Sequence, residues 1–149
     1  MLKNALILCC SLVLAQSALN GQDVSSPQKS TDRLPPVIVS GLQAYKEKGA
    51  DEAIKAWIKD SPIDGSKEAL GQANNLRMIE NFYGSYQTYE LVSSRSISPR
   101  IQVLFLVLDF EKGPLFAKFV VYRSQGGWIV TSFDFNSKSE LIAGWPSAA

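Results

Sequence analysis

The hydrophobic pattern of the chain changes its period once, near Gly84, and this change limits the possible folds more than any other feature. Before Gly84 the apolar residues recur every three or four positions, as on one face of an amphipathic helix. After Gly84, Val, Ile, Phe, Tyr and Thr gather in short runs that turn residues separate, as in strands. A helical half followed by a half of strands predicts an α+β domain.

Three helices are expected in the first half, over residues 37–48, about 51–59 and about 66–83. The pair Pro35-Pro36 suits an extended entry into the first helix. Gly49 and Gly84 are placed to end the first and third helices, because glycine readily adopts the left-handed conformation of a helix C-cap. The helices therefore have start or stop signals as well as apolar faces.

Four strands are expected in the second half, over about 86–96, 101–110, 115–123 and 128–135. Glu111-Lys112-Gly113-Pro114 is typical of a tight hairpin turn, and Gly126-Gly127 supplies positive-φ positions for the next one. Short turns between consecutive strands favour a meander, so we expect an antiparallel sheet of about four strands.

The second expected strand is apolar on both faces, from Val103 to Leu108. The helices of the first half can cover only one face of the sheet, and a large exposed apolar patch is unfavourable in a soluble monomer. We therefore expect a homodimer in which a second copy covers the other sheet face. The alternative is that a long loop or the C-terminal tail of the same chain covers it.

The N-terminus has the three-part pattern of a secretory signal peptide. Lys3 is followed by an apolar run from Ala5 to Leu14 and by small residues that allow cleavage after Ser17 or Ala15. The alternative, a buried or membrane-anchoring helix, fits less well because the run is shorter than the roughly 20 residues that a membrane span needs. The protein is thus expected to be exported, to the periplasm or the medium. The expected segments are a signal peptide at 1–17, a flexible leader at 18–34 and one domain at 35–149.

The mature chain would contain neither cysteine nor histidine. The sequence has no histidine, and its two cysteines, Cys9 and Cys10, lie inside the apolar run of the signal peptide. This excludes thiol nucleophiles, Ser-His-Asp triads, histidine bases and zinc held by cysteine or histidine. No phosphate-binding glycine loop or carboxylate cluster is present, so we expect no cofactor and no metal.

The charges are balanced and mixed along the chain. Removal of Lys3 with the signal peptide leaves equal numbers of basic and acidic residues. No basic stripe follows a phosphate backbone and no polybasic patch faces anionic lipid. We expect no nucleic-acid partner and, after signal cleavage, no membrane partner.

Three segments resemble the nuclear-transport-factor-2-like superfamily: residues 44–54, 79–84 and 127–135. The first is a helix-Gly-helix opening, the second leads from a helix into a long strand, and the third is a closing Gly-Trp strand. The resemblance implies a cone, in which N-terminal helices pack into a strongly curved antiparallel sheet. Many members of this superfamily act as small-ligand pockets or dimer scaffolds without known catalysis, and fold transfers better than function.

The resemblance favours a non-catalytic exported domain that binds a small apolar or amphipathic ligand, or a protein partner, as a homodimer. The candidate ligand-binding residues are Trp57, Tyr83, Tyr86, Arg100 and Tyr122. Arg100 stands near a strand end, where a guanidinium can bind an anionic group through two hydrogen bonds or pair with Glu90 or Asp109 across the sheet. Trp57 is first expected in the core and only second in a pocket wall.

Two further functions stay open. An isomerase, dehydratase or cyclase would use Asp134, a carboxylate between Phe133 and Phe135, with a tyrosine hydroxyl from Tyr45, Tyr83, Tyr86 or Tyr122. Strand alternation argues against it, since Asp134 would point to water while both phenylalanines point inward. The third possibility is an interaction module whose cone is filled by side chains and whose sheet face is the working surface.

Overall fold

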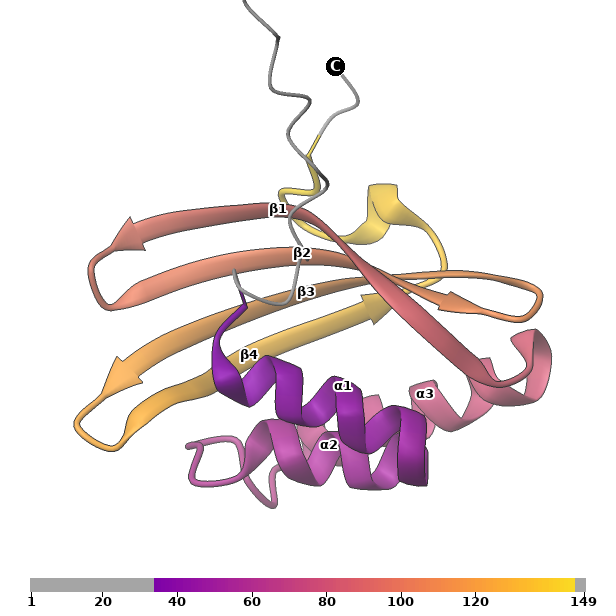
Figure 1. Cartoon of the computed structure of the whole chain (residues 1–149), viewed down its shortest axis with the longest axis horizontal. Helices are drawn as coiled ribbons and strands as arrows, with labels where there is room; N and C mark the ends of the chain where they lie inside the picture. Colours follow the sequence, from indigo (N-terminus) through magenta and orange to yellow (C-terminus); the bar gives the residue numbers. More distant parts are fainter. Residues whose placement is uncertain (1–33, 147–149) are drawn as a thin grey trace, which may run out of the picture.

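A computed structural model describes residues 34–146 of the chain. The helices are α1 (Pro36–Lys48), α2 (Ala50–Ile58) and α3 (Lys67–Tyr83). The strands are β1 (Tyr86–Ser98), β2 (Ile101–Phe110), β3 (Gly113–Ser124) and β4 (Gly127–Asn136), followed by the short 3₁₀ helix η2 (Ser139–Leu141) (Figure 1). The predicted signal peptide, and the predicted leader up to residue 33, lie outside the described residues.

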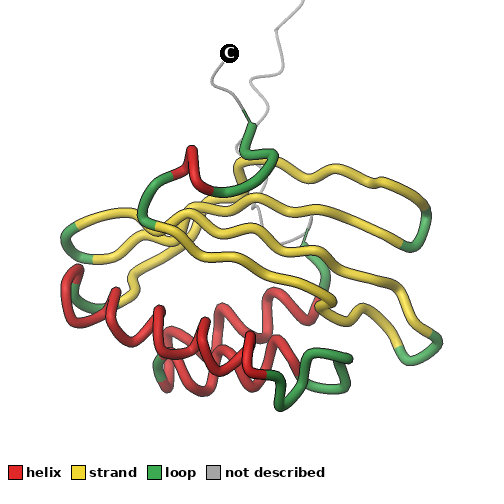
Figure 2. The backbone as a smooth tube through the Cα atoms, turned by 180° about the vertical axis from the view of Figure 1, so that it is seen from behind, coloured by secondary structure: helices red, strands yellow, loops and turns green. Residues whose placement is uncertain are grey.

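The four strands form one antiparallel sheet in the order β1-β2-β3-β4. All three helices lie against one face of this sheet, and the segment after β4 returns over the other face (Figures 1 and 2). The predicted α+β class, with N-terminal helices and a four-stranded antiparallel meander, is confirmed. Within residues 34–146 no helix is long and apolar enough to cross a membrane.

Glycines end two of the helices as the sequence predicts. Gly49 follows α1 with a φ of 89°, and Gly84 follows α3 with a φ of 81°. Each donates its backbone N–H to a carbonyl of the last helical turn, at 2.9 Å from Tyr45 and 2.9 Å from Glu80. Ser66 caps the start of α3, since its Oγ accepts a hydrogen bond of 3.1 Å from the backbone N–H of Ala69.

Aromatic rings fill the space between the helices and the inner face of the sheet. Trp57 is fully buried, and its ring centroid lies 5.0 Å from that of Phe119 and 5.6 Å from that of Phe135. The indole Nε1 of Trp57 donates a hydrogen bond of 3.2 Å to the carbonyl of Ile38 on α1. These rings and the buried aliphatic residues around them form one cluster, called here the main core. Leu34 is also buried in it, one residue before the predicted start of the domain at residue 35.

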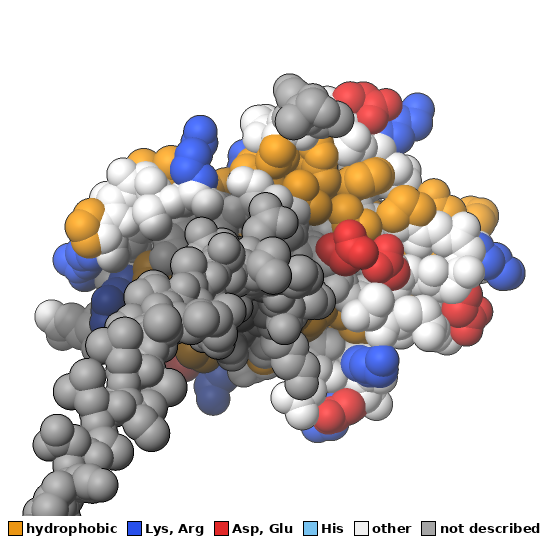
Figure 3. Space-filling model, turned by 45° about the horizontal axis from the view of Figure 1, so that its top comes forward, with side chains coloured by type: hydrophobic (Ala, Val, Ile, Leu, Met, Phe, Trp, Pro, Cys, Tyr) orange, Lys and Arg blue, Asp and Glu red, His pale blue; other side chains and the backbone are white. Residues whose placement is uncertain are grey.

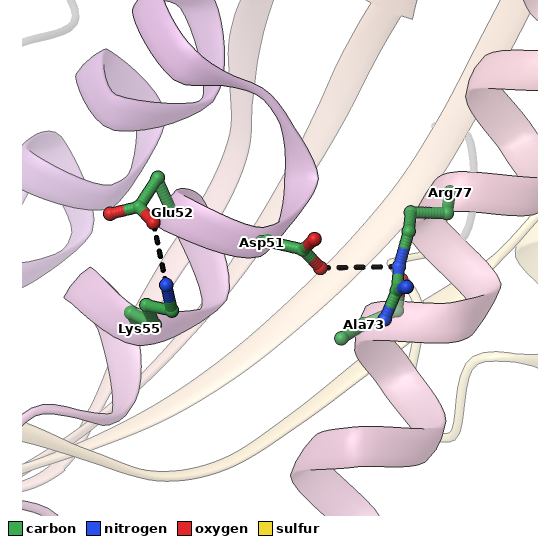
Figure 4. Close-up of polar contacts among 5 residues, drawn as sticks. All are labelled: Asp51, Glu52, Lys55, Ala73 and Arg77. Atoms are coloured by element: carbon green, nitrogen blue, oxygen red, sulfur yellow. Dashed lines mark hydrogen bonds and ion pairs between the residues drawn. The ribbon is translucent and has the colours of Figure 1, made fainter.

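Polar contacts join α2 to its neighbours on the outside of the molecule. The carboxylate of Asp51, at the start of α2, forms an ion pair with Arg77 on α3, with 3.1 Å between Oδ1 and Nε (Figure 4). Within α2, Glu52 forms an ion pair with Lys55. Both partners of the Asp51–Arg77 pair are about half exposed, so water screens it and its contribution to stability is below about 1 kcal/mol. The packing of α3 therefore depends on its buried apolar face.

Candidate functional site

The outer face of the sheet, which points away from the helices, carries its own apolar cluster. Alternation along β2 sends Val103 and Phe105 to this face, and alternation along β3 sends Phe116 and Val120 there. The alternate residues of β2, Leu104, Leu106 and Leu108, belong to the core on the helix side of the sheet. This explains why β2 is apolar on both faces.

Residues 138–146, called here the C-terminal segment, cover part of the outer face. Ile142 is buried against Val103 and Phe105. The indole of Trp145 meets the rings of Phe105 and Phe116 edge-on, at centroid distances of 5.6 and 5.0 Å. The segment is thus held mainly by apolar and aromatic contacts.

Lys118 on β3 fixes the backbone of the C-terminal segment. Its Nζ donates a hydrogen bond of 2.7 Å to the carbonyl of Ala143 and lies 5.9 Å from the ring centroid of Phe105. The sequence allows either the C-terminal tail or a second copy of the protein to cover the outer face. Over this part of the face, the cover is the chain's own C-terminal segment.

An open hollow of about 780 Å³ remains between the C-terminal segment and the strands. Its sheet side consists of Val92, Val107 and Phe116, and its other wall includes Ile142 and Trp145. Val92 is 44% exposed. Hydrophobic side chains gather on this side of the molecule, with charged side chains of both signs beside them (Figure 3). We call this feature the outer groove.

Asp134 also lies on the outer face. Its neighbours Phe133 and Phe135 are buried in the main core, while Asp134 itself is half-buried and pairs in register with Lys118 of β3. The sheet therefore separates Asp134 from the buried tyrosines of the helix side. The arrangement that the enzyme hypothesis requires, Asp134 beside a tyrosine within the cone, is not formed.

Arg100 and Tyr122 lie together at the end of the β2–β3 pair. The guanidinium carbon of Arg100 lies 4.9 Å from the ring centroid of Tyr122, and its Nε donates a hydrogen bond of 3.1 Å to the carbonyl of Arg123. The side chain of Arg100 thus packs along its own hairpin. The sequence alone predicts instead that it binds an anionic ligand or pairs with a carboxylate across the sheet.

The three remaining candidates lie on the opposite side of the sheet. Trp57 fills the main core, and Tyr86 is buried with its ring stacked on that of Tyr45 at 4.8 Å. Tyr83 is half-buried next to Gly113. The structure therefore brings Arg100 together with Tyr122, but it does not unite the five candidates in one pocket.

The residues of the outer groove were mostly missed as site residues. Ile142 and Trp145 follow a polar stretch and show no helical or strand period, so no periodic signal assigns them to a face. The available signal was an isolated Ile and Trp after the last strand, because Ile and Trp are on average among the more buried residue types. Val92 lies at a bulge of β1, where the register against β2 shifts between Leu91 and Ser93.

The geometry defines the class of the domain as α+β, with three N-terminal helices on a four-stranded antiparallel sheet. No protein-family model matches the chain, and no curated protein matches it. A solved structure from Nostoc punctiforme PCC 73102, described as a domain of unknown function with a cystatin-like fold, is similar with a TM-score of 0.49. Its identity to this chain is 11%, over 73% of this chain and 77% of that chain.

Proposed function

We propose that this protein is an exported, non-catalytic interaction module that pairs with a second copy of itself through the outer face of the sheet. The observation that carries the proposal is the outer groove, a hollow of about 780 Å³ that the C-terminal segment leaves open and whose mainly apolar lining also includes Ser139 and Glu140. Exposed apolar surface of this kind, bordered by polar residues, is characteristic of protein interaction sites.

The filled inner face favours interaction over ligand binding within the cone. A ligand cavity in the cone needs several hundred Å³ of open space lined by apolar groups. Here Trp57, Phe119 and Phe135 occupy that region at ring-centroid distances of 5.0 to 5.6 Å. Among the hypotheses that the sequence leaves open, the interaction module with a filled cone fits this packing best.

A second copy is the partner that suits the charges around the outer groove. Strand register places Glu90 and Arg95 of β1 opposite Val107 and Val103 on this face. A surface that mixes both signs can meet itself across a twofold axis with opposite charges facing each other. A partner of one sign would gain less from such a surface, so self-association is the preferred interaction.

Oligomeric state tests the proposal most simply. Val92→Asp puts a charge into the outer groove at an exposed position, where folding should tolerate it. In size-exclusion chromatography with light-scattering detection, we expect the unaltered protein to elute as a dimer. We expect the dimer dissociation constant of the Val92→Asp variant to be at least tenfold higher. Met78→Asp on α3 is the control, because Met78 is 52% exposed but lies on the helical side. A dimer that is equally stable in both variants would contradict the proposal.

Export rests on the signal-peptide pattern at residues 1–17. We expect the protein secreted by its own host to start after Ser17 or Ala15, which intact mass measurement of the purified protein would establish. A mass that includes Met1 to Leu14 would contradict export by signal cleavage. This result is independent of the oligomeric state.

A further inference from the structure

Charged residues divide the outer face of the sheet into an acidic end and a basic end. Register and alternation place Glu90 of β1 and Asp109 of β2 on this face, toward the β2–β3 turn. Arg95 of β1 lies on the same face toward the β1–β2 turn, and Arg100 lies in that turn. Acidic side chains gather mainly on the right of Figure 3, the side of the β2–β3 turn. The outer face therefore has a charge direction along the strands.

These charges are not neutralised by ion pairs within the described chain. Both ion pairs of residues 34–146 lie on the helical side of the sheet. Glu90 and Arg95 are exposed, and their register partners Val107 and Val103 lie about 13 Å apart at the rise of about 3.3 Å per residue of a strand. An ion pair needs a separation of about 4 Å or less. Both charges are therefore available to another molecule.

Val92 lies between these two charges on β1 and is 44% exposed. It lines the outer groove, whereas the C-terminal segment packs on residues of β2 and β3. Lys118 and Asp134 lie opposite each other in register on the same face, so their charges offset each other. An exposed apolar residue with opposite charges on its two sides is self-complementary, because a second β1 that runs the other way meets each charge with its opposite.

Two orientations allow the outer faces of two copies to meet across a twofold axis. If the axis runs along the strands, the acidic ends of both copies face each other, and like charges repel. If the axis runs across the strands, each acidic end faces the basic end of the other copy.

We propose that the second orientation forms, with two β1 strands facing each other antiparallel around Val92. Glu90 of each copy then pairs with Arg95 of the other. This inference rests on the proposed self-association, and it names the residues that set the orientation of the two copies. Charge pairs across an interface act mainly in this way, by selecting one arrangement over its alternatives.

Charge reversal tests the pairing. Arg95→Glu or Glu90→Arg alone should raise the dimer dissociation constant by about tenfold or more, because each reversal makes two like-charge contacts across the twofold axis. The protein with both substitutions should return to within about threefold of the parent, since the opposite charges meet again. Lys67→Glu, at an exposed position of α3, is the control and should leave the constant unchanged. Sedimentation equilibrium measures these constants.

Chemical cross-linking measures the orientation without changing any charge. With the β1 strands antiparallel around Val92, Val92→Cys brings two thiols to the twofold axis. The sequence has no cysteine after residue 10, so the introduced thiol is alone in the mature chain. A bismaleimide with a span of about 10 Å, the usual spacing of two packed sheets, should join the two copies. Met78→Cys, exposed on α3, should not give this product.

The outcomes separate the orientation from self-association itself. A parent protein that stays monomeric would overturn both proposals. A dimer that responds to neither charge reversal, or whose affinity is not restored in the doubly substituted protein, would overturn the orientation alone. A dimer that is not cross-linked through residue 92 would do the same.

Discussion

At the residue scale, two glycines within helices have opposite surroundings. A Cβ at Gly41 on α1 would overlap the indole ring of Trp57, whereas a Cβ at Gly71 on α3 would meet nothing within 4 Å. Gly41 is therefore required by the close approach of α1 to a buried ring. Gly71 has no such neighbour in the described chain, and it costs helix stability relative to alanine.

These surroundings predict opposite effects of the same substitution. Gly41→Ala should lower the free energy of unfolding by about 1–3 kcal/mol, because Trp57 is fully buried and has little room to move. Gly71→Ala should raise it by about 0.5–1 kcal/mol. Urea denaturation of both variants would measure the difference. A Gly41→Ala protein as stable as the parent would contradict the packing of α1 on Trp57.

Glu80 predicts a pH-dependent stability. Its folded-state pKa is raised, so protonation favours the folded protein, and this stabilisation is lost as the pH rises through the folded-state pKa. Glu80→Gln imitates the neutral form, so it should stabilise the protein at pH 7 by at most about 1 kcal/mol, since solvent screens a half-buried group. The gain should vanish below about pH 4, where the unfolded carboxyl is also protonated. Denaturation at both pH values checks this, and an equal gain at both would contradict it.

At the element scale, Ser61 ties the loop before α3 to the sheet. Its Oγ donates a hydrogen bond of 2.6 Å to the carbonyl of Val130 on β4 and accepts one of 3.2 Å from the N–H of Ile63. Ser61 is also buried. A side chain that satisfies two backbone groups cannot be replaced by a methyl group without leaving both unpaired.

Ser61→Ala should therefore destabilise the protein by about 1–3 kcal/mol. Ser40→Ala, at an exposed position of α1, is the matched control and should change stability by less than about 0.5 kcal/mol. Thermal or urea unfolding distinguishes the two. Equal stability of both variants would show that the loop is anchored by other contacts.

The elements themselves were predictable because each has a local signal. Gly49 and Gly84 end helices at the expected positions, and the strand bounds agree to within a few residues because turns such as 111–114 separate apolar runs. The C-terminal segment was not predictable in the same way. Its attachment depends on Ile142 and Trp145 meeting rings from β2 and β3, and such long-range contacts leave no period in the sequence.

The candidate site was predicted less well than the fold. Arg100 and Tyr122 do lie together, but Trp57 and Tyr86 lie on the other side of the sheet. An aromatic residue on the apolar face of a helix or strand is predicted to be buried. Whether it lies in a core or lines a pocket depends on which side chains of other elements fill the space next to it. For Trp57 that space is filled by phenylalanine rings, which only the assembled fold reveals.

At the scale of the whole molecule, the two faces of the sheet have different roles. The inner face is covered by helices and closed by aromatic rings, and it holds the fold together. The outer face carries a smaller cluster, and the C-terminal segment covers it only in part (Figure 2). The outer groove, a mainly apolar hollow beside that segment, is the surface that the proposed self-association would bury.

Native mass spectrometry of the protein purified from its own host, over a series of concentrations, tests this central claim most directly. We predict a dimer at micromolar concentration that shifts toward monomer on dilution and in the Val92→Asp variant. A protein that stays monomeric over the whole series would contradict self-association through the outer groove.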